Sequence, residues 1–200
     1  MPIRIVKQNE VKYDASCVVV CFPVISSKEI TENDSEFLKE AYTMIPSGNY
    51  YSQYDKVATA RGKPGTISVH YKPASKNTHG IINMFIRLYH GNKTHTNDNV
   101  KLRLKYFKQC LEKLLTYETL KIVHFEPIPV EDRVDGRDFI DAIDDFSSTY
   151  SLNFNRQLDI IVHDNQPLAI DDEAILTCDE DQISDQPLYE VDFVRYVFIK

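Results

Sequence analysis

Residues 17–24 read CVVVCFPV, an almost unbroken run of β-branched and apolar side chains that Pro23 helps to end. A run of this kind, with no polar alternation, predicts a strand buried on both faces of a sheet. Further apolar stretches occur at residues 80–89 (GIINMFIRLY), 121–126 (KIVHFE) and 158–163 (LDIIVH). Segments with the apolar spacing of helices separate the last three of these stretches. Strands that alternate with crossover helices become parallel neighbours, so the sequence predicts an α/β fold with a mostly parallel sheet.

The helices are predicted from apolar spacing and capping residues. A first helix begins after Asn33 or Asp34 and ends near Met44. A second, capped by Thr96 or Asn97 and ending near residue 117, has an inward face made of Val100, Leu104, Phe107, Leu111 and Leu114. A third, acidic helix spans 137–146 after a loop at 127–136. Shorter strands are expected at 3–7 and 66–71, and Lys101, Lys105 and Lys108 are expected to face solvent.

Length and composition indicate one intracellular domain. The chain has 200 residues, 42% of them hydrophobic, with no apolar run near the ~18 residues that a membrane helix needs. The first residues lack the apolar stretch of a signal peptide, so we expect a cytoplasmic or nuclear protein. The four cysteines form no CxxC pair, which predicts reduced cysteines and no structural zinc.

Charge is distributed unevenly along the chain. Residues 1–125 carry 18 Lys+Arg and 11 Asp+Glu, whereas residues 126–200 carry 5 and 19. One interpretation is that these are the basic and acidic faces of one fold. The other is that the basic half binds an anionic ligand and the acidic C-terminal region binds a protein partner. So acidic a second half argues against nucleic acid as a partner.

Several side chains are candidates for chemistry at the strand ends. His124 and His163 end strands that we expect to be neighbours, where a histidine can act as acid, base or phosphate partner; alternatively, backbone groups satisfy both. Asn83 is a candidate for positioning water or a ribose, or is a buried amide. Tyr50, Tyr51 and Tyr54 can stack on a base or pack on the core. The motifs GxxxxGK[ST], GxGxxG, GxSxG and HExxH are missing.

One carboxylate-rich loop has the oxygen ligands of a divalent-cation site, although such a run is more often simply solvated. It consists of Glu126, Glu131, Asp132 and Asp135. His90 and His95 lack the nearby cysteines or carboxylates of a zinc site. The sequence therefore predicts no metal and no cofactor.

In its order of elements the chain resembles the macro domain, the ADP-ribose-binding module, over roughly residues 15–165. VVVCFPV, then EFLKEAYTMIP and Tyr50-Tyr51, look like the family's strand, helix and tyrosine. GIINMFIR looks like its strand ending in "vvNmf-Q", followed by a helix with a Cys110-Leu111 pair. Residues 125–146 look like its strand, proline, phosphate loop and helix, with Gly136-Arg137-Asp138-Phe139 at the helix start, and LDIIVHD looks like its last strand.

The resemblance implies a three-layer sandwich with ADP-ribose or a related nucleotide at the carboxyl ends of the strands. It implies that Asn83 and His124 place a water molecule for hydrolysis. It further implies a set of ligand-binding residues: Tyr50, Tyr51, Arg87, Pro129, Gly136, Phe139 and His163.

The sequence departs from the family in both phosphate loops. Those loops are glycine-rich because backbone N–H groups must approach a diphosphate closely. Residues 25–35 contain no glycine but include Glu29, Glu32 and Asp34, and the second loop keeps only Gly136. Arg87 stands where a glutamine is common.

Two functions therefore stay open. One is a nucleotide-binding module. The other is a degenerate, non-catalytic interaction scaffold, of a kind that fits a virus-encoded protein, which docks a protein partner. The expected organisation is a macro-like domain over residues 1–165 and an acidic extension over 166–200, with a β-hairpin on the sheet edge as one arrangement.

Overall fold

The computed structural model describes residues 3–7, 17–53, 62–70, 80–90, 96–130 and 133–164. Among these residues, six strands form one mixed sheet with the order β1-β6-β5-β2-β4-β3. The strands are β1 (Arg4–Lys7), β2 (Cys17–Cys21), β3 (Thr66–His70), β4 (Gly80–Phe85), β5 (Ile122–Phe125) and β6 (Asp159–Asp164). All neighbours are parallel except β3 and β4. The predicted fold class, a mostly parallel sheet flanked by helices, is confirmed.

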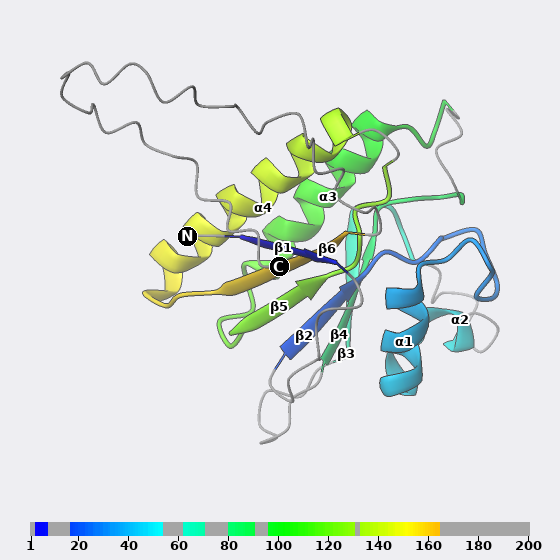
Figure 1. The fold of residues 1–200 in the computed structure, drawn as a ribbon, viewed down its shortest axis with the longest axis horizontal. Helices are drawn as coiled ribbons and strands as arrows, with labels where there is room; N and C mark the ends of the chain where they lie inside the picture. The colour runs from blue at the N-terminus through cyan, green and yellow to red at the C-terminus, as the bar shows by residue number, and fades with distance from the viewer. Residues whose placement is uncertain are drawn as a thin grey trace, which may run out of the picture.

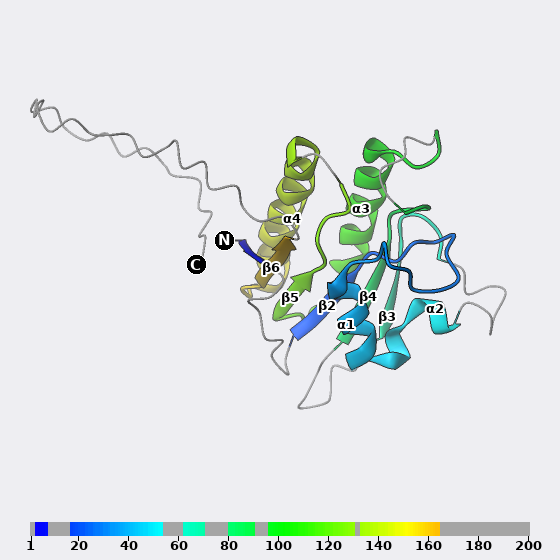
Figure 2. The same cartoon turned by 45° about the vertical axis from the view of Figure 1, so that its right-hand side comes forward.

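Helices cover both faces of the sheet (Figures 1 and 2). On one face lie α1 (Glu36–Met44) and α2 (Tyr50–Gln53), joined by a 3-10 turn over Pro46–Gly48, and on the other face lie α3 (Val100–Leu114) and α4 (Arg133–Phe154). The central strand β2 is buried along its whole length, as its apolar run predicts. Val18 and Val20 face α3 and α4, while Cys17, Val19 and Cys21 face α1, so two apolar cores form.

Two helix starts differ from the prediction. Ser35 caps α1, accepting a hydrogen bond from the Leu38 N–H at 3.1 Å, although Asn33 and Asp34 were the predicted caps. Asn99 caps α3, not Thr96 or Asn97. Asp34 is buried in an ion pair with Arg87, so the cap of α1 falls to the next suitable side chain, Ser35. Asp98 is likewise buried in an ion pair, with Arg103, and the residue after it caps α3.

The acidic helix is longer than predicted. It begins at Arg133 and ends at Phe154, so Gly136 lies inside α4 and not in a loop. The helix continues past residue 146 because its buried face continues: Phe146 and Tyr150 are buried in the core, and Phe154 packs against the core. The predicted boundary at residue 165 and the acidic extension lie outside the described residues. Within the described ranges no helix is both long enough and apolar enough to cross a membrane.

Candidate functional site

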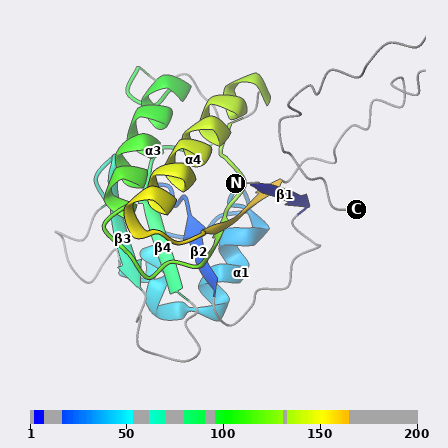
Figure 3. The ribbon, with the colours of Figure 1, turned by 90° about the vertical axis from the view of Figure 1, so that its left-hand side faces the viewer.

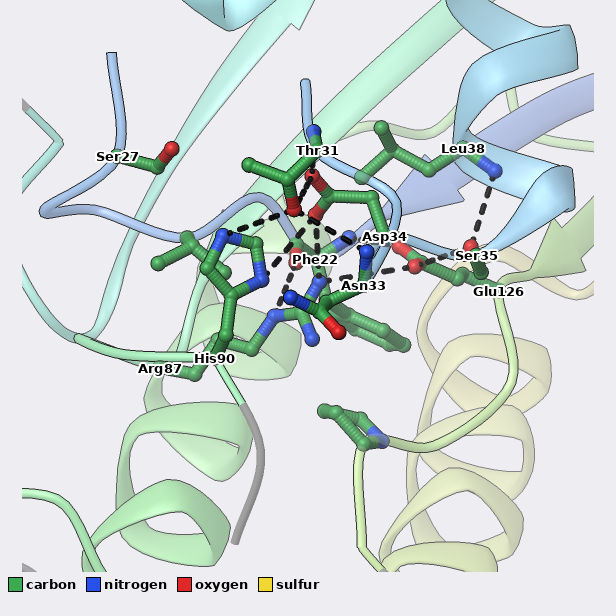
Figure 4. Close-up of polar contacts among 12 residues, drawn as sticks. Phe22, Ser27, Thr31, Asn33, Asp34, Ser35, Leu38, Arg87, His90 and Glu126 are labelled. Atoms are coloured by element: carbon green, nitrogen blue, oxygen red, sulfur yellow. Dashed lines mark hydrogen bonds and ion pairs between the residues drawn. The ribbon is translucent and has the colours of Figure 1, made fainter. Parts of the chain in front are cut away.

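The carboxyl ends of β2, β4 and β5 meet at one edge of the sheet, where the side chains in Figure 4 gather. Three connections border this edge: residues 22–35, between β2 and α1, residues 86–90, after β4, and residues 126–130, after β5. We call the polar group here the strand-end site, and it comprises Phe22 (through its backbone), Thr31, Asp34, Ser35, Arg87, His90 and Glu126. In parallel sheets this edge is the usual place for a ligand.

Arg87 is the central cation of the strand-end site and is only 6% exposed. Its Nε donates to the Phe22 carbonyl oxygen at 2.7 Å, and its Nη2 lies 3.4 Å from Asp34 Oδ1 and 3.9 Å from Glu126 Oε1. The guanidinium therefore already has two buried carboxylates as partners. One cation between two carboxylates does not provide the positive field that a diphosphate requires.

Asp34 is held in place by several donors. The Thr31 N–H donates to its Oδ2 at 2.8 Å, and the Tyr51 hydroxyl donates to its Oδ1 at 3.4 Å. His90 Nδ1 lies 3.8 Å from Asp34 Oδ1, and His90 Nε2 lies 3.4 Å from Thr31 Oγ1. Burial lowers the pKa of His90, and Asp34 opposes that shift. The carboxylate thus organises the residues before α1 instead of facing a ligand.

Glu126 is buried behind Arg87 and accepts two hydrogen bonds. The Phe22 N–H donates to its Oε2 at 2.5 Å and the Ser35 hydroxyl donates to its Oε1 at 2.6 Å. Burial raises the pKa of this carboxyl above its ordinary value, and Arg87 partly opposes the rise. Glu126 therefore joins the end of β2, the start of α1 and the start of the connection after β5.

Backbone donors between residues 22 and 34 are used inside the protein. Ile25 N–H and Ser26 N–H donate to the carbonyl oxygens of Arg87 and Leu88, both at 3.1 Å. Val24 N–H donates to the Tyr51 hydroxyl at 2.9 Å. The other N–H groups with internal acceptors are those of Phe22, Ser27, Thr31, Asn33 and Asp34. A phosphate-binding loop presents such N–H groups to its ligand, and here most of them are occupied. Among the described residues, no acceptor is found for the N–H groups of residues 28–30 and 32.

Three of the predicted site residues lie in the core on the α1 face. Asn83 is fully buried: its Oδ1 accepts from the Tyr42 hydroxyl at 2.8 Å, and its Nδ2 donates to the Gly48 carbonyl oxygen and to Ser68 Oγ. Tyr50 and Tyr51 are 4% and 6% exposed. Their hydroxyls hold Ile25 and Val24 in place. Asn83 thus has the contacts of a buried amide, and Tyr50 and Tyr51 have those of aromatic residues packed on the core, which were the alternatives to ligand binding. Tyr54 lies outside the described residues.

The two histidines are neighbours, as predicted, on strands β5 and β6. His124 Nδ1 lies 3.1 Å from His163 Nε2, and both residues are almost fully buried. The His163 ring packs edge-on against Phe37 of α1, with centroids 4.6 Å apart. The pair therefore faces α1 and not the strand-end site, and its role toward a ligand stays a prediction.

Acid is expected to destabilise the protein through His163. Burial, and then the neighbouring His124, lower the pKa of His163 to about 3 from an ordinary 6.5. The unfolded chain therefore binds a proton that the folded chain does not, so the stabilisation is present above pH 6.5 and is lost as the pH falls toward 3. The free energy of unfolding should fall by up to about 1.4 kcal/mol per pH unit in this range. Urea unfolding of the native chain and of His163→Gln checks this, since the variant should show a smaller slope and an unchanged slope would contradict it.

The remaining predicted ligand residues come from the connection after β5 and from α4. The Pro129 carbonyl oxygen accepts from Arg103 Nη1 at 2.9 Å. Gly136 lies within α4, and a Cβ there would make an ordinary 3.6 Å contact with Val130, so no close approach requires glycine. Phe139 is fully buried, with its ring 5.3 Å from that of Phe107. The loop position expected for Gly136 was wrong because the helix begins at Arg133, four residues before its predicted start.

A second buried ion pair was missed from the sequence. Arg103 Nε lies 2.7 Å from Asp98 Oδ1, and Asp98 Oδ2 accepts from the N–H groups of Leu88 and Tyr89. Neither Asp98, next to the predicted cap Asn97, nor Arg103 was predicted to form an ion pair. The available signal was an arginine six residues after Asn97, between inward-facing Val100 and Leu104.

No metal site is indicated within the described part of the chain, where no three His, Cys, Asp or Glu side chains are placed to hold an ion. The carboxylate-rich loop falls mostly outside it, because Glu131, Asp132 and the Asp135 side chain are not described.

No protein-family model matches the sequence, and no curated protein matches it either. Similarity is found among solved structures. The macrodomain of Thermus aquaticus DarG aligns with a TM-score of 0.50 and 14% identity, covering 82% of this chain and 98% of that one. The macrodomain of Mycobacterium tuberculosis DarG aligns with a TM-score of 0.49 and 11% identity, covering 82% and 99%. With a six-stranded mixed sheet between two helical layers and similarity to the Thermus aquaticus structure over most of its length, this chain has the fold of a macrodomain in a divergent sequence.

Proposed function

We propose that the chain is a non-catalytic macrodomain-fold scaffold that acts by binding another protein, and that its strand-end site does not bind nucleotide. The observation that carries this proposal is the use of backbone donors. Of the twelve N–H groups from Phe22 to Asp34, eight donate to acceptors within the protein. A diphosphate would have to displace these acceptors, and each buried donor or acceptor left unpaired costs about 1–3 kcal/mol.

Electrostatics support the same conclusion. Arg87 lies between Asp34 and Glu126, so the buried part of the strand-end site holds one basic and two acidic side chains. Exposed Glu29 and Glu32, with one exposed cation, Lys28, between β2 and α1, leave the surface of this connection net negative. An incoming diphosphate would meet carboxylates at short range, and like charges in a partly buried setting repel strongly.

A thermal-shift titration with ADP-ribose, ADP, ATP and NAD tests the proposal. We expect no change in melting temperature with any of the four. At about 1 mM ligand, a Kd of about 10 µM would stabilise the fold by about 2.7 kcal/mol, which such an assay detects easily. A clear rise in melting temperature with ADP-ribose would contradict the proposal.

Binding of ADP-ribose or a related nucleotide is the second candidate, and Arg87 is the observation that favours it. A cation at the carboxyl ends of three strands is suitably placed for a phosphate if the connection before α1 moves and releases it from Asp34. In that case the rise in melting temperature would be lost in Arg87→Lys, which keeps the charge but not the planar fork. It would persist in Arg156→Lys, the same change at an exposed arginine.

A further inference from the structure

The helices α3 and α4 form one outer layer of the molecule, side by side on the same face of the sheet (Figure 3). Each crosses from the end of one parallel strand to the start of the next, α3 from β4 to β5 and α4 from β5 to β6. The two helices therefore run in the same direction. Their inner sides pack in the core through residues such as Phe107 and Phe139, which leaves their outer sides facing away from the sheet.

The outer sides of the two helices carry opposite charges. On α3, three exposed lysines follow one another at a spacing of four and three residues: Lys101, Lys105 and Lys108. On α4, three exposed aspartates follow at a spacing of three and four residues: Asp138, Asp141 and Asp145. Both spacings place side chains on one face of a helix. We call these sets the basic stripe and the acidic stripe.

Neither stripe is neutralised within the part of the chain that the structure describes. Of the ion pairs found there, none involves any of the six side chains. The acidic face continues beyond Asp145 to Leu152, an apolar side chain that is 85% exposed. Counting every exposed charged side chain described on the two helices, α3 carries four lysines and one glutamate, and α4 carries four aspartates and one arginine. The layer thus presents a net positive helix beside a net negative one of equal magnitude, with an exposed leucine on the acidic side.

We propose that this helical layer is a self-association surface whose partner is a second copy of the chain. A twofold axis parallel to the helices lays the basic stripe of each copy on the acidic stripe of the other. A twofold axis across the helices would instead set like charges against each other. The inference deepens the proposed scaffold function and rests on it, since it names the protein that the scaffold binds.

Charge balance is the reason to prefer a second copy over another partner. A purely acidic partner would match Lys101, Lys105 and Lys108 but would be repelled by the adjacent aspartates, and a purely basic partner would meet the reverse problem. A second copy satisfies both stripes at once and in the same number. Because the six charges are exposed, the association is sensitive to salt, and screening acts over about 10 Å at 0.1 M ionic strength.

Sedimentation of the full chain over a range of concentrations, at about 50 mM and at about 1 M salt, tests the proposal. A dimer is expected at low salt and its dissociation at high salt. Two charge-reversed variants sharpen the test: Lys105→Glu with Lys108→Glu, and Asp141→Lys with Asp145→Lys. Each alone should raise the dimer Kd about tenfold or more, because its two stripes then carry the same sign.

Mixing the two variants is the decisive step. The mixture should restore a dimer made of one copy of each, since every stripe again meets its opposite. A native chain that stays monomeric at all concentrations would overturn the proposal. So would a mixture that stays monomeric, which would mean that the charges act on something else, such as the acidic segment 165–200. Circular dichroism establishes that both variants fold, and the nucleotide titration, read separately, shows whether the scaffold proposal itself fails.

Discussion

Replacing Arg103 with methionine is expected to remove a large part of the stability of the fold. Arg103 is 2% exposed and bonds to both Asp98 oxygens, at 2.7 and 2.9 Å, and to the Pro129 carbonyl oxygen at 2.9 Å. Methionine fills similar space but leaves the Asp98 carboxylate buried without its cation. Breaking a buried ion pair on one side costs about 3–5 kcal/mol, out of a typical 5–15 kcal/mol for a domain.

Urea unfolding followed by circular dichroism measures this loss. Arg156→Met is the matched control, because Arg156 is exposed and, among the described residues, makes one hydrogen bond, to the Glu118 carbonyl oxygen. It should change stability by about 0.5 kcal/mol or less. Adding Asp98→Asn to Arg103→Met should recover part of the loss, since an asparagine oxygen still accepts from Leu88 and Tyr89. A loss below about 1 kcal/mol in Arg103→Met would contradict the importance of the pair.

The sheet and its parallel connections could be predicted because their signals are local. The apolar run at residues 17–24 predicted a strand buried on both faces, and Cys17–Cys21 is such a strand. The apolar spacing of Phe107, Leu111 and Leu114 correctly predicted the buried side of α3. The length of α4 could also have been predicted, since Phe146, Tyr150 and Phe154 repeat every four residues. Gly136 suggested a loop instead because glycine is a poor helix former.

The strand-end site was less predictable because its interactions connect distant parts of the chain. Arg87 was predicted to bind a ligand, and the sequence identified the right edge of the sheet for it. Its partner Asp34 is 53 residues away and Glu126 is 39 residues away, and no periodic pattern links such positions. Asn83 lies on a central strand, and its partners Tyr42 and Ser68 come from α1 and β3. These long-range contacts decide whether a polar side chain is free to bind a ligand or is already bonded to another side chain of the same protein.

Replacing Arg87 with methionine should have the second large effect, and one that depends on pH. At pH 7 the variant leaves Asp34 and Glu126 buried without their cation, so we expect a loss of about 3–5 kcal/mol. Burial already raises the pKa of Glu126 above its ordinary 4.5, and Arg87 opposes that rise, so removing Arg87 raises the pKa further. A carboxyl group whose pKa is raised in the folded protein stabilises the fold at pH values below its ordinary pKa. That stabilisation is lost as the pH rises through the raised pKa of the folded state.

The deficit of Arg87→Met relative to the native chain should therefore shrink as the pH falls from 7 toward 5, because a protonated Glu126 no longer needs a cation. Urea unfolding at several pH values measures this difference directly. Adding Glu126→Gln should recover stability at pH 7 and remove most of the pH dependence, since glutamine keeps an acceptor for Phe22 and Ser35 without a charge. If Arg87→Met instead loses the same stability at pH 5 as at pH 7, Glu126 is not the charge that Arg87 neutralises, and Asp34 alone holds the arginine in place.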